Sequence, residues 1–161
     1  MTLNINRTTV STPKGDTLTG AGNATINGNE GNDLLLSRGV GRNTLRGGKG
    51  NDTLLGFAND QLFGDQGDDI LYAGSSSRLT GGEGRDRFVV TNGSLPAGIN
   101  TITDFTPDVD LIVFKGVVGR YSGLQISARG SGSVIRFDGL DVVTINNVAP
   151  ARLGRENFVF E

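Results

Sequence analysis

The chain has 161 residues, 26 of them glycine, with a formal net charge of −2 and no histidine or cysteine. The missing residue types exclude disulfide bonds, thiol nucleophiles, cysteine and histidine zinc sites, and catalytic triads that need an imidazole. The nearly balanced charge and the short apolar runs predict no nucleic-acid partner, no signal peptide and no membrane-spanning helix.

In chain order, residues 1–14 are polar and predict a short N-terminal cap, which is followed by a repeat in residues 15–92. Four nonapeptides, here called the strong motifs, have glycine at positions one and four and aspartate at position six. Their starts are 19, 17 and 17 residues apart, and they read GNEGNDLLL (28–36), GGKGNDTLL (47–55), GDQGDDILY (64–72) and GGEGRDRFV (81–89).

Weaker copies, here called the weak motifs, alternate with the strong ones: TGAGNATI (19–26), RGVGRNTL (38–45), LGFANDQL (55–62) and YAGSSSRL (72–79). Strong and weak copies together place one large apolar residue at every eighth to tenth position: Leu18, Ile26, Leu35, Leu45, Leu54, Leu62, Leu71, Leu79 and Phe88. This period predicts a solenoid of glycine-rich turns and short strands, with two units per coil. Strong turns then stack along one edge and weak turns along the other, with the apolar column between two parallel sheets.

Residues 93–161 differ from the repeat. Segments such as DLIVF, SVIRF and DVVTIN combine β-branched and aromatic residues between turn signals such as GSG and FDG. This pattern predicts ordinary, mainly antiparallel strands. We expect this block to cap the open end of the solenoid.

The glycines and aspartates of the strong turns predict a cation site. Glycine permits backbone angles that aim several carbonyl oxygens into one small space. Stacking would place Asp33, Asp52, Asp69 and Asp86 in a row at about the 4.8 Å spacing of neighbouring strands, where their charges repel one another. A shell of carboxylate and carbonyl oxygens suits Ca²⁺ better than Mg²⁺. We therefore expect calcium between successive turns.

The strong motifs resemble the RTX, or haemolysin-type, calcium-binding repeat GGxGxDxUx. The resemblance implies an all-β fold, a right-handed parallel β-roll of calcium-stacked repeats capped by a mainly antiparallel C-terminal β block. It also implies that the carbonyls of positions one and three bind one ion, those of positions two and four bind the next, and the aspartate contributes to both. The implied ligands are Gly28, Asn29, Glu30, Gly31, Asp33, Gly47, Gly48, Lys49, Gly50, Asp52, Gly64, Asp65, Gln66, Gly67, Asp69, Gly81, Gly82, Glu83, Gly84 and Asp86.

The ions are expected mainly along one edge. Four strong turns make three sites between turns, and Asp16, in KGDTL, is in phase and would close a fourth. On the weak edge only the Asn43/Asp60 pair could hold an ion. Asp104 and Asp110 could bind one more, although solvated turn carboxylates explain them as well. Asn29 and Asp65 depart from the motif by replacing its second glycine.

The tail is similar to the region that follows such repeats in secreted proteases, lipases and mannuronan epimerases. The matching stretches are GRDRFVV, ITDFTPDVDLIVFKGV, SVIRFDGLDVVTINNV and the terminal ENFVFE, with Asp108 where the family usually has glycine. The resemblance implies export by a type I secretion apparatus, with residues 157–160 either part of a C-terminal signal or simply a last strand.

Two functional hypotheses follow. The first is a non-catalytic, calcium-binding module of a secreted or cell-surface protein that folds and is stabilised by calcium outside the cell. The second is a module that binds acidic polysaccharide or the cell surface through Arg38, Arg42, Arg46 and Arg78, which lie on or beside the weak turns. A carboxylate-pair glycosidase is disfavoured, because the carboxylates repeat regularly and no insertion forms a cleft. Leu34, Leu36 and Ile70 do not fit the inward column, and the sequence leaves their environment open.

Overall fold

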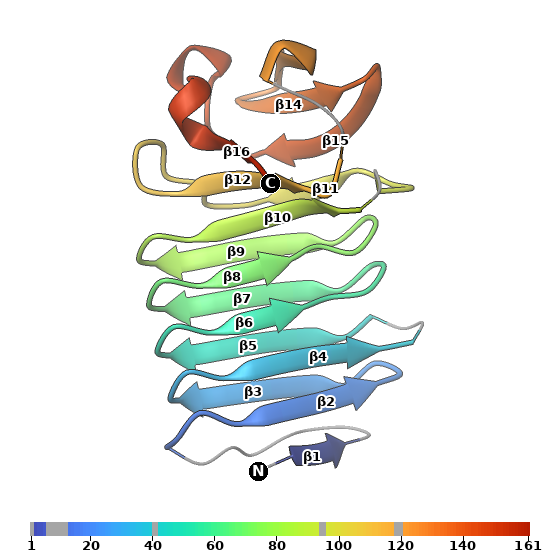
Figure 1. Cartoon of the computed structure of the whole chain (residues 1–161), viewed down its shortest axis with the longest axis vertical. Helices are drawn as coiled ribbons and strands as arrows, with labels where there is room; N and C mark the ends of the chain where they lie inside the picture. Colours follow the sequence, from blue (N-terminus) through green and yellow to red (C-terminus); the bar gives the residue numbers. More distant parts are fainter. Residues whose placement is uncertain (1, 6–12, 40–41, 94–95, 118–120) are drawn as a thin grey trace.

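The structure, a computed structural model, describes residues 2–5, 13–39, 42–93, 96–117 and 121–161. Its strands form two sheets of eight strands that face each other, and strands β2 to β12 belong to the two sheets in alternation along the chain (Figure 1). Sheet A has the order β1 (Thr2–Ile5), β2 (Thr17–Ala21), β4 (Leu34–Arg38), β6 (Thr53–Leu55), β8 (Ile70–Tyr72), β10 (Arg87–Asn92), β12 (Leu111–Lys115) and β16 (Phe158–Phe160).

Sheet B begins with β3 (Thr25–Glu30), β5 (Thr44–Lys49), β7 (Gln61–Gln66), β9 (Arg78–Glu83) and β11 (Asn100–Ile102). It ends with β15 (Leu140–Ile145), β14 (Gly132–Phe137) and β13 (Leu124–Arg129). The other described elements are three short 3₁₀ helices, η1 (Tyr121–Gly123), η2 (Pro150–Arg152) and η3 (Arg155–Asn157). The predicted all-β solenoid is therefore confirmed. No helix in the described ranges is both long and apolar enough to cross a membrane.

The predicted apolar column forms the core of the solenoid. In the parallel register of sheet A, Leu18, Leu35, Leu54, Leu71, Phe88 and Ile112 stand opposite one another. Sheet B aligns Ile26, Leu45, Leu62, Leu79 and Ile102 in the same way. All of these side chains are fully buried between the sheets. One large apolar residue per short strand is enough to fill the space between the sheets, because the residues on either side of it in the strand point to the outer face.

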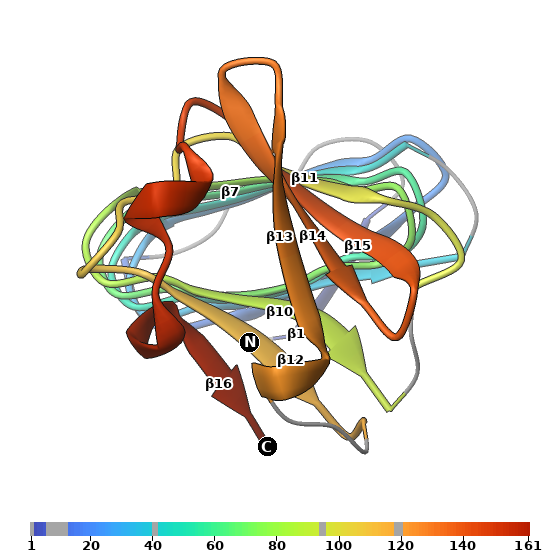
Figure 2. The same ribbon diagram turned by 90° about the horizontal axis from the view of Figure 1, so that it is seen from above.

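The C-terminal block combines two kinds of pairing. Strands β11, β12 and β16 continue the parallel sheets, whereas antiparallel pairing among the described strands joins β13 to β14 and β14 to β15. Phe114, Phe137 and Phe160 close this end of the core, with ring centroids 5.1 to 6.0 Å apart. Figure 2 shows the β13–β15 segment lying across the end of the two stacked sheets. The block therefore covers the otherwise open C-terminal end of the solenoid.

The apolar residues that did not fit the column lie on the outer face of sheet A. Leu34 and Ile70 align on either side of Thr53, and Leu36 aligns with Leu55 and Tyr72. These side chains are half-buried. The Lys115 ammonium donates a hydrogen bond to the Tyr72 hydroxyl at 3.4 Å, so a long side chain covers part of this face.

Candidate metal centre

The four strong turns connect sheet B to sheet A and lie along one edge of the solenoid. The second residue of each turn has a positive φ: +69° at Asn29, +112° at Gly48, +76° at Asp65 and +106° at Gly82. Among residues with a side chain, asparagine and aspartate tolerate this region best. The two departures from the motif therefore preserve the turn geometry that glycine provides elsewhere.

The aspartates at position six form a ladder that crosses the turns. In each step the backbone N–H of one aspartate donates to the Oδ1 of the aspartate in the following turn. The donor–acceptor distances are 2.7 Å from Asp33 to Asp52, 2.7 Å from Asp52 to Asp69, and 3.0 Å from Asp69 to Asp86. The ladder reproduces the predicted row and fixes one oxygen of each carboxylate.

The second oxygen of each carboxylate is buried without a protein partner. The Oδ2 atoms of Asp33, Asp52, Asp69 and Asp86 accept no hydrogen bond, although these residues are at most 3% exposed. A Cβ on Gly28 would lie 2.4 Å from the Asp33 Oδ2 and 2.3 Å from the Gly47 carbonyl oxygen of the next turn. Oxygens from two successive turns converge in the same way above Gly47 and Gly64, in a space that any side chain would fill, whereas above Gly81 the nearest atoms belong to the Asp86 carboxylate and the Phe88 ring.

Burial makes these charges unfavourable in the protein alone. Desolvation is the largest cause that raises the pKa of Asp52 to about 6, that of Asp69 to about 7 and that of Asp86 to about 6. The backbone hydrogen bonds of the ladder lower these pKa values, and neighbouring carboxylates raise them further. Buried carboxylates with an unused oxygen are the environment that a hard cation stabilises.

Carbonyl groups supply the other available oxygens. A Cβ on Gly48 would lie 2.2 Å from the carbonyl oxygen of Asn29 in the preceding turn. A Cβ on Gly50 would likewise lie 2.1 Å from the carbonyl oxygen of Gly31. No three acidic side chains converge into a metal cluster within the described ranges. A cation on this edge would therefore be held by one or two aspartates and several carbonyls, as the donor set of the strong motifs provides.

A second ladder at position five was missed by the sequence analysis. The Oδ1 atoms of Asn32, Asn51 and Asp68 each accept the backbone N–H of position five in the following turn, at 2.8 to 2.9 Å. This ladder runs in the opposite direction to the position-six ladder. The signal was present in the sequence, because position five is Asn, Asn and Asp in the first three strong motifs.

Among the described residues, the weak edge has no comparable set of carboxylate oxygens without a partner. Asp60 is 1% exposed, but its Oδ2 accepts the Phe57 N–H at 2.7 Å and its Oδ1 accepts the Asn43 N–H at 2.8 Å and its side-chain amide at 3.1 Å. The Asn43 Oδ1 in turn accepts the Ala24 N–H at 2.9 Å. The Asn43/Asp60 pair is thus used in hydrogen bonds within the protein.

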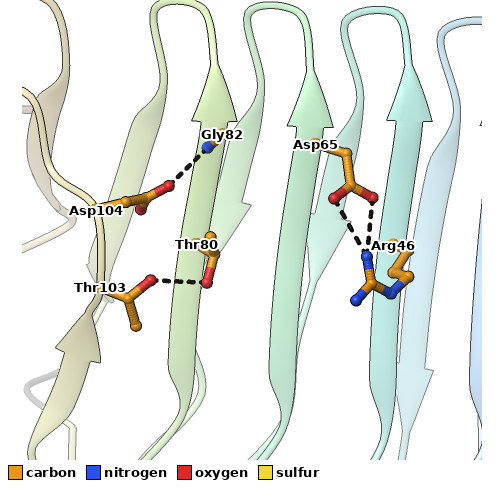
Figure 3. A network of polar contacts seen from close by, with 6 residues as sticks. All are labelled: Arg46, Asp65, Thr80, Gly82, Thr103 and Asp104. Atoms are coloured by element: carbon orange, nitrogen blue, oxygen red, sulfur yellow. Dashed lines mark hydrogen bonds and ion pairs between the residues drawn. The ribbon is translucent and has the colours of Figure 1, made fainter.

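The remaining predicted carboxylates lie at the two ends of the ladder. The Asp16 N–H donates to the Asp33 Oδ1 at 2.6 Å, and the Asp86 N–H donates to the Asp110 Oδ1 at 3.0 Å. Asp110 therefore continues the row, but its Oδ2 also accepts the Thr106 N–H at 2.8 Å. Asp104 caps the last strong turn by accepting the Gly81 N–H at 3.0 Å and the Gly82 N–H at 2.9 Å. Figure 3 shows the second of these hydrogen bonds.

The four arginines do not all share one environment. Arg38 and Arg42 are exposed on either side of one weak turn, and Arg78 is exposed at the start of β9. Arg46, on the outer face of sheet B, is 3.3 Å from the Asp65 carboxylate and lies over the Phe63 ring, 4.3 Å from its centroid. Figure 3 shows this ion pair between neighbouring strands.

The fold and this edge define a parallel β-solenoid whose acidic, glycine-rich turns are stacked in register. The family model of the RTX calcium-binding nonapeptide repeat (4 copies) matches residues 18–39, 37–71 and 56–77. The match covers residues 18–77, and the resemblance of the repeats in this range is confirmed. No curated protein matches the chain in sequence.

Solved structures with a similar fold include the extracellular lipase LipA from Serratia marcescens, with 15% identity and a TM-score of 0.43. This match covers 96% of the chain and 40% of the lipase. The AlgE6R3 subunit of the Azotobacter vinelandii mannuronan C5-epimerase has 24% identity and a TM-score of 0.45, covering 96% of the chain and 82% of the subunit. The AlgE6R2 subunit of the same epimerase has 24% identity and a TM-score of 0.38, with 97% and 92% covered. At these identities and TM-scores the likeness is a general one of fold alone.

Proposed function

We propose that the chain is a non-catalytic module that folds when calcium fills the strong edge and that works outside the cell. The observation that carries this proposal is the column of four buried Oδ2 atoms without a partner. A folded protein without a cation would keep several like charges desolvated and close together, which is unfavourable. Calcium would convert the same atoms into ligands.

Because calcium binds only the folded chain, folding would depend on the calcium concentration of the compartment. An ion that binds only the folded chain stabilises it by about 1.4 kcal/mol per site when its free concentration is tenfold above the dissociation constant. Three sites between the strong turns would add roughly 4 kcal/mol, a large part of a typical domain stability. At the low calcium concentration of the cytosol this contribution disappears. The chain would then stay unfolded until it has been exported.

Type I secretion is consistent with this order of events. Strand β16 pairs with β12, and Phe160 stacks on Phe114 at 5.1 Å. A secretion signal in residues 157–160 would be accessible only before this strand has packed. Folding after export would therefore keep the signal available inside the cell.

The test is far-UV circular dichroism during a calcium titration that starts in EGTA, with magnesium as the control ion. We expect a cooperative gain of β signal with calcium and none at the same magnesium concentration. A chain that is fully folded in EGTA and unchanged by calcium would contradict the proposal.

A second candidate function is the binding of acidic polysaccharide. The exposed Arg78 stands opposite Thr101 in the register of sheet B. Thr101 lines a cavity of about 330 Å³ together with Thr144 and the exposed Arg129. Cationic and hydroxyl-bearing side chains in and beside one cavity suit a carboxylated glycan.

Retention on an alginate column in the presence of calcium tests this function. We expect weaker retention when Arg38, Arg42, Arg46 and Arg78 are all replaced by serine. The matched control replaces Arg152 and Arg155, which lie in the η2 and η3 segments. Equal retention of both variants and the unchanged protein would reject the polysaccharide function.

A further inference from the structure

The weak edge repeats one half of the strong-edge construction. At position six of the weak motifs a side-chain Oδ1 accepts the backbone N–H of position six in the preceding weak turn, at 2.9 Å from Ala24 to Asn43 and 2.8 Å from Asn43 to Asp60. Asn100, in the turn that follows the weak motifs, accepts the Ser77 N–H at 2.9 Å. These three hydrogen bonds use only one carboxylate, that of Asp60.

The second polar atom of the accepting side chain distinguishes the two edges. On the strong edge it is an Oδ2 without a partner, whereas Asn43 presents its amide nitrogen there. This Nδ2 donates to the Ser37 Oγ at 3.0 Å and to the Asp60 Oδ1 of the next coil at 3.1 Å. All three residues are at most 3% exposed. A neutral N–H donor therefore bridges two successive coils inside the weak edge.

Hydroxyl and backbone donors close the next weak turn. The Ser77 Oγ donates to the Phe57 carbonyl at 2.8 Å, and the Phe57 N–H donates to the Asp60 Oδ2 at 2.7 Å. At the end of this edge the buried side-chain atom without a partner is the Asn100 Nδ2, which is itself a donor. Calcium needs lone pairs from several oxygens. In the described part of the chain, the weak edge thus places N–H groups where the strong edge places oxygens.

The weak turns also differ from the strong turns in length. In every strong motif the second residue after the core residue is a glycine, and the aspartate follows five positions later, as from Gly47 to Asp52. In the weak motifs this separation is four or six positions, and it is four from Gly56 to Asp60. The two kinds of turn therefore cannot arrange their carbonyl groups in the same way.

Apolar side chains fill the corresponding space of the weak turns. A Cβ on Gly20 would first meet the Ala24 Cβ and the Ile26 Cγ1, both at 2.9 Å, and a Cβ on Gly56 would first meet the Leu62 Cδ1 at 2.7 Å. Carboxylate and carbonyl oxygens occupy this place in the strong turns. The weak edge therefore differs from the strong edge both in its donors and in the lining of its turns.

We propose that the weak edge is held together without metal, because the Asn43 amide and the Ser77 hydroxyl take the place of cations between the coils. The proposal rests on the calcium-dependent function and refines it, since calcium is then required on one edge alone. Asn43 is the residue that decides this preference, because its amide lies against the Asp60 carboxylate. The weak edge keeps the coils in register at any calcium concentration at which the chain is folded.

The experiment counts bound calcium by native mass spectrometry and follows folding by circular dichroism during a calcium titration of the full chain. Asp60→Asn is compared with Asp52→Asn, since both aspartates are 1% exposed and accept the N–H of the preceding turn through Oδ1. Asn43→Asp is compared with Asn23→Asp. Asn23 is an exposed weak-turn residue that accepts the Arg42 N–H at 3.0 Å, so the control adds the same charge outside the edge.

We expect Asp60→Asn to bind as many ions as the unchanged protein and Asp52→Asn to bind fewer. Asn43→Asp should also keep the number of ions, but it should need a several-fold higher calcium concentration to fold. Its new carboxylate oxygen faces the Asp60 carboxylate without a cation between them, and buried like charges repel each other. Asn23→Asp should fold at the same calcium concentration as the unchanged protein.

Loss of an ion in Asp60→Asn would overturn the proposal and leave the calcium-dependent function standing. So would an Asn43→Asp protein that binds one more ion and folds at a lower calcium concentration. If either variant does not fold, the other decides. No bound calcium in any of the proteins, with folding independent of calcium, would overturn the proposed function together with this inference.

Discussion

Replacing Asp69 by asparagine should change the free energy of unfolding in opposite directions with and without calcium. Asp69 lies in the middle of the ladder and is 0% exposed. Its Oδ1 accepts the Asp52 N–H at 2.7 Å, and its Oδ2 has no partner. An asparagine oxygen can keep the bond to Asp52, while its amide group can donate toward the Gly81 carbonyl, which converges on the same space.

The magnitude without calcium follows from the pKa of Asp69. Burial raises this pKa from 3.8 to about 7. A difference of that size corresponds to roughly 4 kcal/mol of unfavourable free energy in the charged folded state at high pH. Neighbouring groups relax when one charge is removed, so we expect Asp69→Asn to stabilise the calcium-free chain at pH 8 by about 2 kcal/mol.

With calcium the sign reverses if the substitution removes both ions to which the aspartate is expected to contribute. Loss of two sites removes about 2.8 kcal/mol when calcium is tenfold above the dissociation constant, which exceeds the gain of about 2 kcal/mol from removing the charge, whereas loss of one site would not. Urea unfolding followed by circular dichroism, in EGTA and in calcium at pH 8, measures both effects. If the calcium-free chain is unfolded, an osmolyte titration measures the same difference from the unfolded side.

Asp60→Asn is the matched control on the weak edge. Both Asp60 oxygens accept backbone N–H groups, so the new amide group faces a donor, which costs about 1 to 3 kcal/mol. The loss should be equal in EGTA and in calcium. If Asp69→Asn destabilises the calcium-free chain as much as Asp60→Asn does, the Oδ2 of Asp69 is not an unfavourable charge and the argument from the ladder fails.

Three further predictions concern pH, a glycine and the core. The pKa values of Asp52, Asp69 and Asp86 in the folded chain lie near 6 to 7 instead of 3.8, so the folded chain binds more protons than the unfolded chain between these pH values. The stability of the calcium-free protein should therefore be highest near pH 4 and fall as the pH rises to 8. Thermal melts in EGTA that show constant or rising stability over this range would contradict the prediction. Gly64→Ala places a Cβ 2.1 Å from the Asp69 Oδ2 and should weaken the calcium binding that calorimetry measures. Gly22→Ala is the control, because its Cβ would have no neighbour within 4 Å and should lower the free energy of unfolding by only about 1 kcal/mol through backbone strain. Leu62→Ala should lower the free energy of unfolding by about 2 to 5 kcal/mol to the same extent with and without calcium, and a calcium-dependent loss in urea titrations would show that core and edge are coupled.

The apolar column and the aspartate row could be predicted because their information is local and repeated. A residue at position eight must face inward if each strand is short and each turn has the same shape. Leu45 and Leu62 therefore align although they lie in weak motifs of different sequence. Turn geometry could be predicted equally well, since Asn29 and Asp65 replace glycine with the two residue types that share its backbone preference.

Features that depend on contacts between turns could not be predicted in the same way. In the sequence, Asn32 is an ordinary polar turn residue. Its role as an acceptor follows only from the stacking of the next turn, whose Asn51 N–H donates to it. Asp110 follows Asp86 by 24 residues and not by 17, so no period identifies it as the next member of the row. Strand β12 has the composition of an antiparallel strand, yet the chain returns to sheet A and pairs in parallel with β10.

The two ladders make the strong edge cooperative in both directions. Position six of each turn supplies an acceptor to the turn before it, and position five supplies one to the turn after it, so an inner turn satisfies its backbone only when both neighbours are stacked. The loop at the C-terminal end does not depend on a neighbouring turn in this way. The Asp110 N–H donates to the Thr106 carbonyl at 2.9 Å, and the Thr106 N–H donates to the Asp110 Oδ2. A loop whose backbone groups bond within the loop can become ordered before its neighbours. Its carboxylates can then accept hydrogen bonds from the last nonapeptide. The fold therefore needs calcium most in the inner turns, where no such local closure exists.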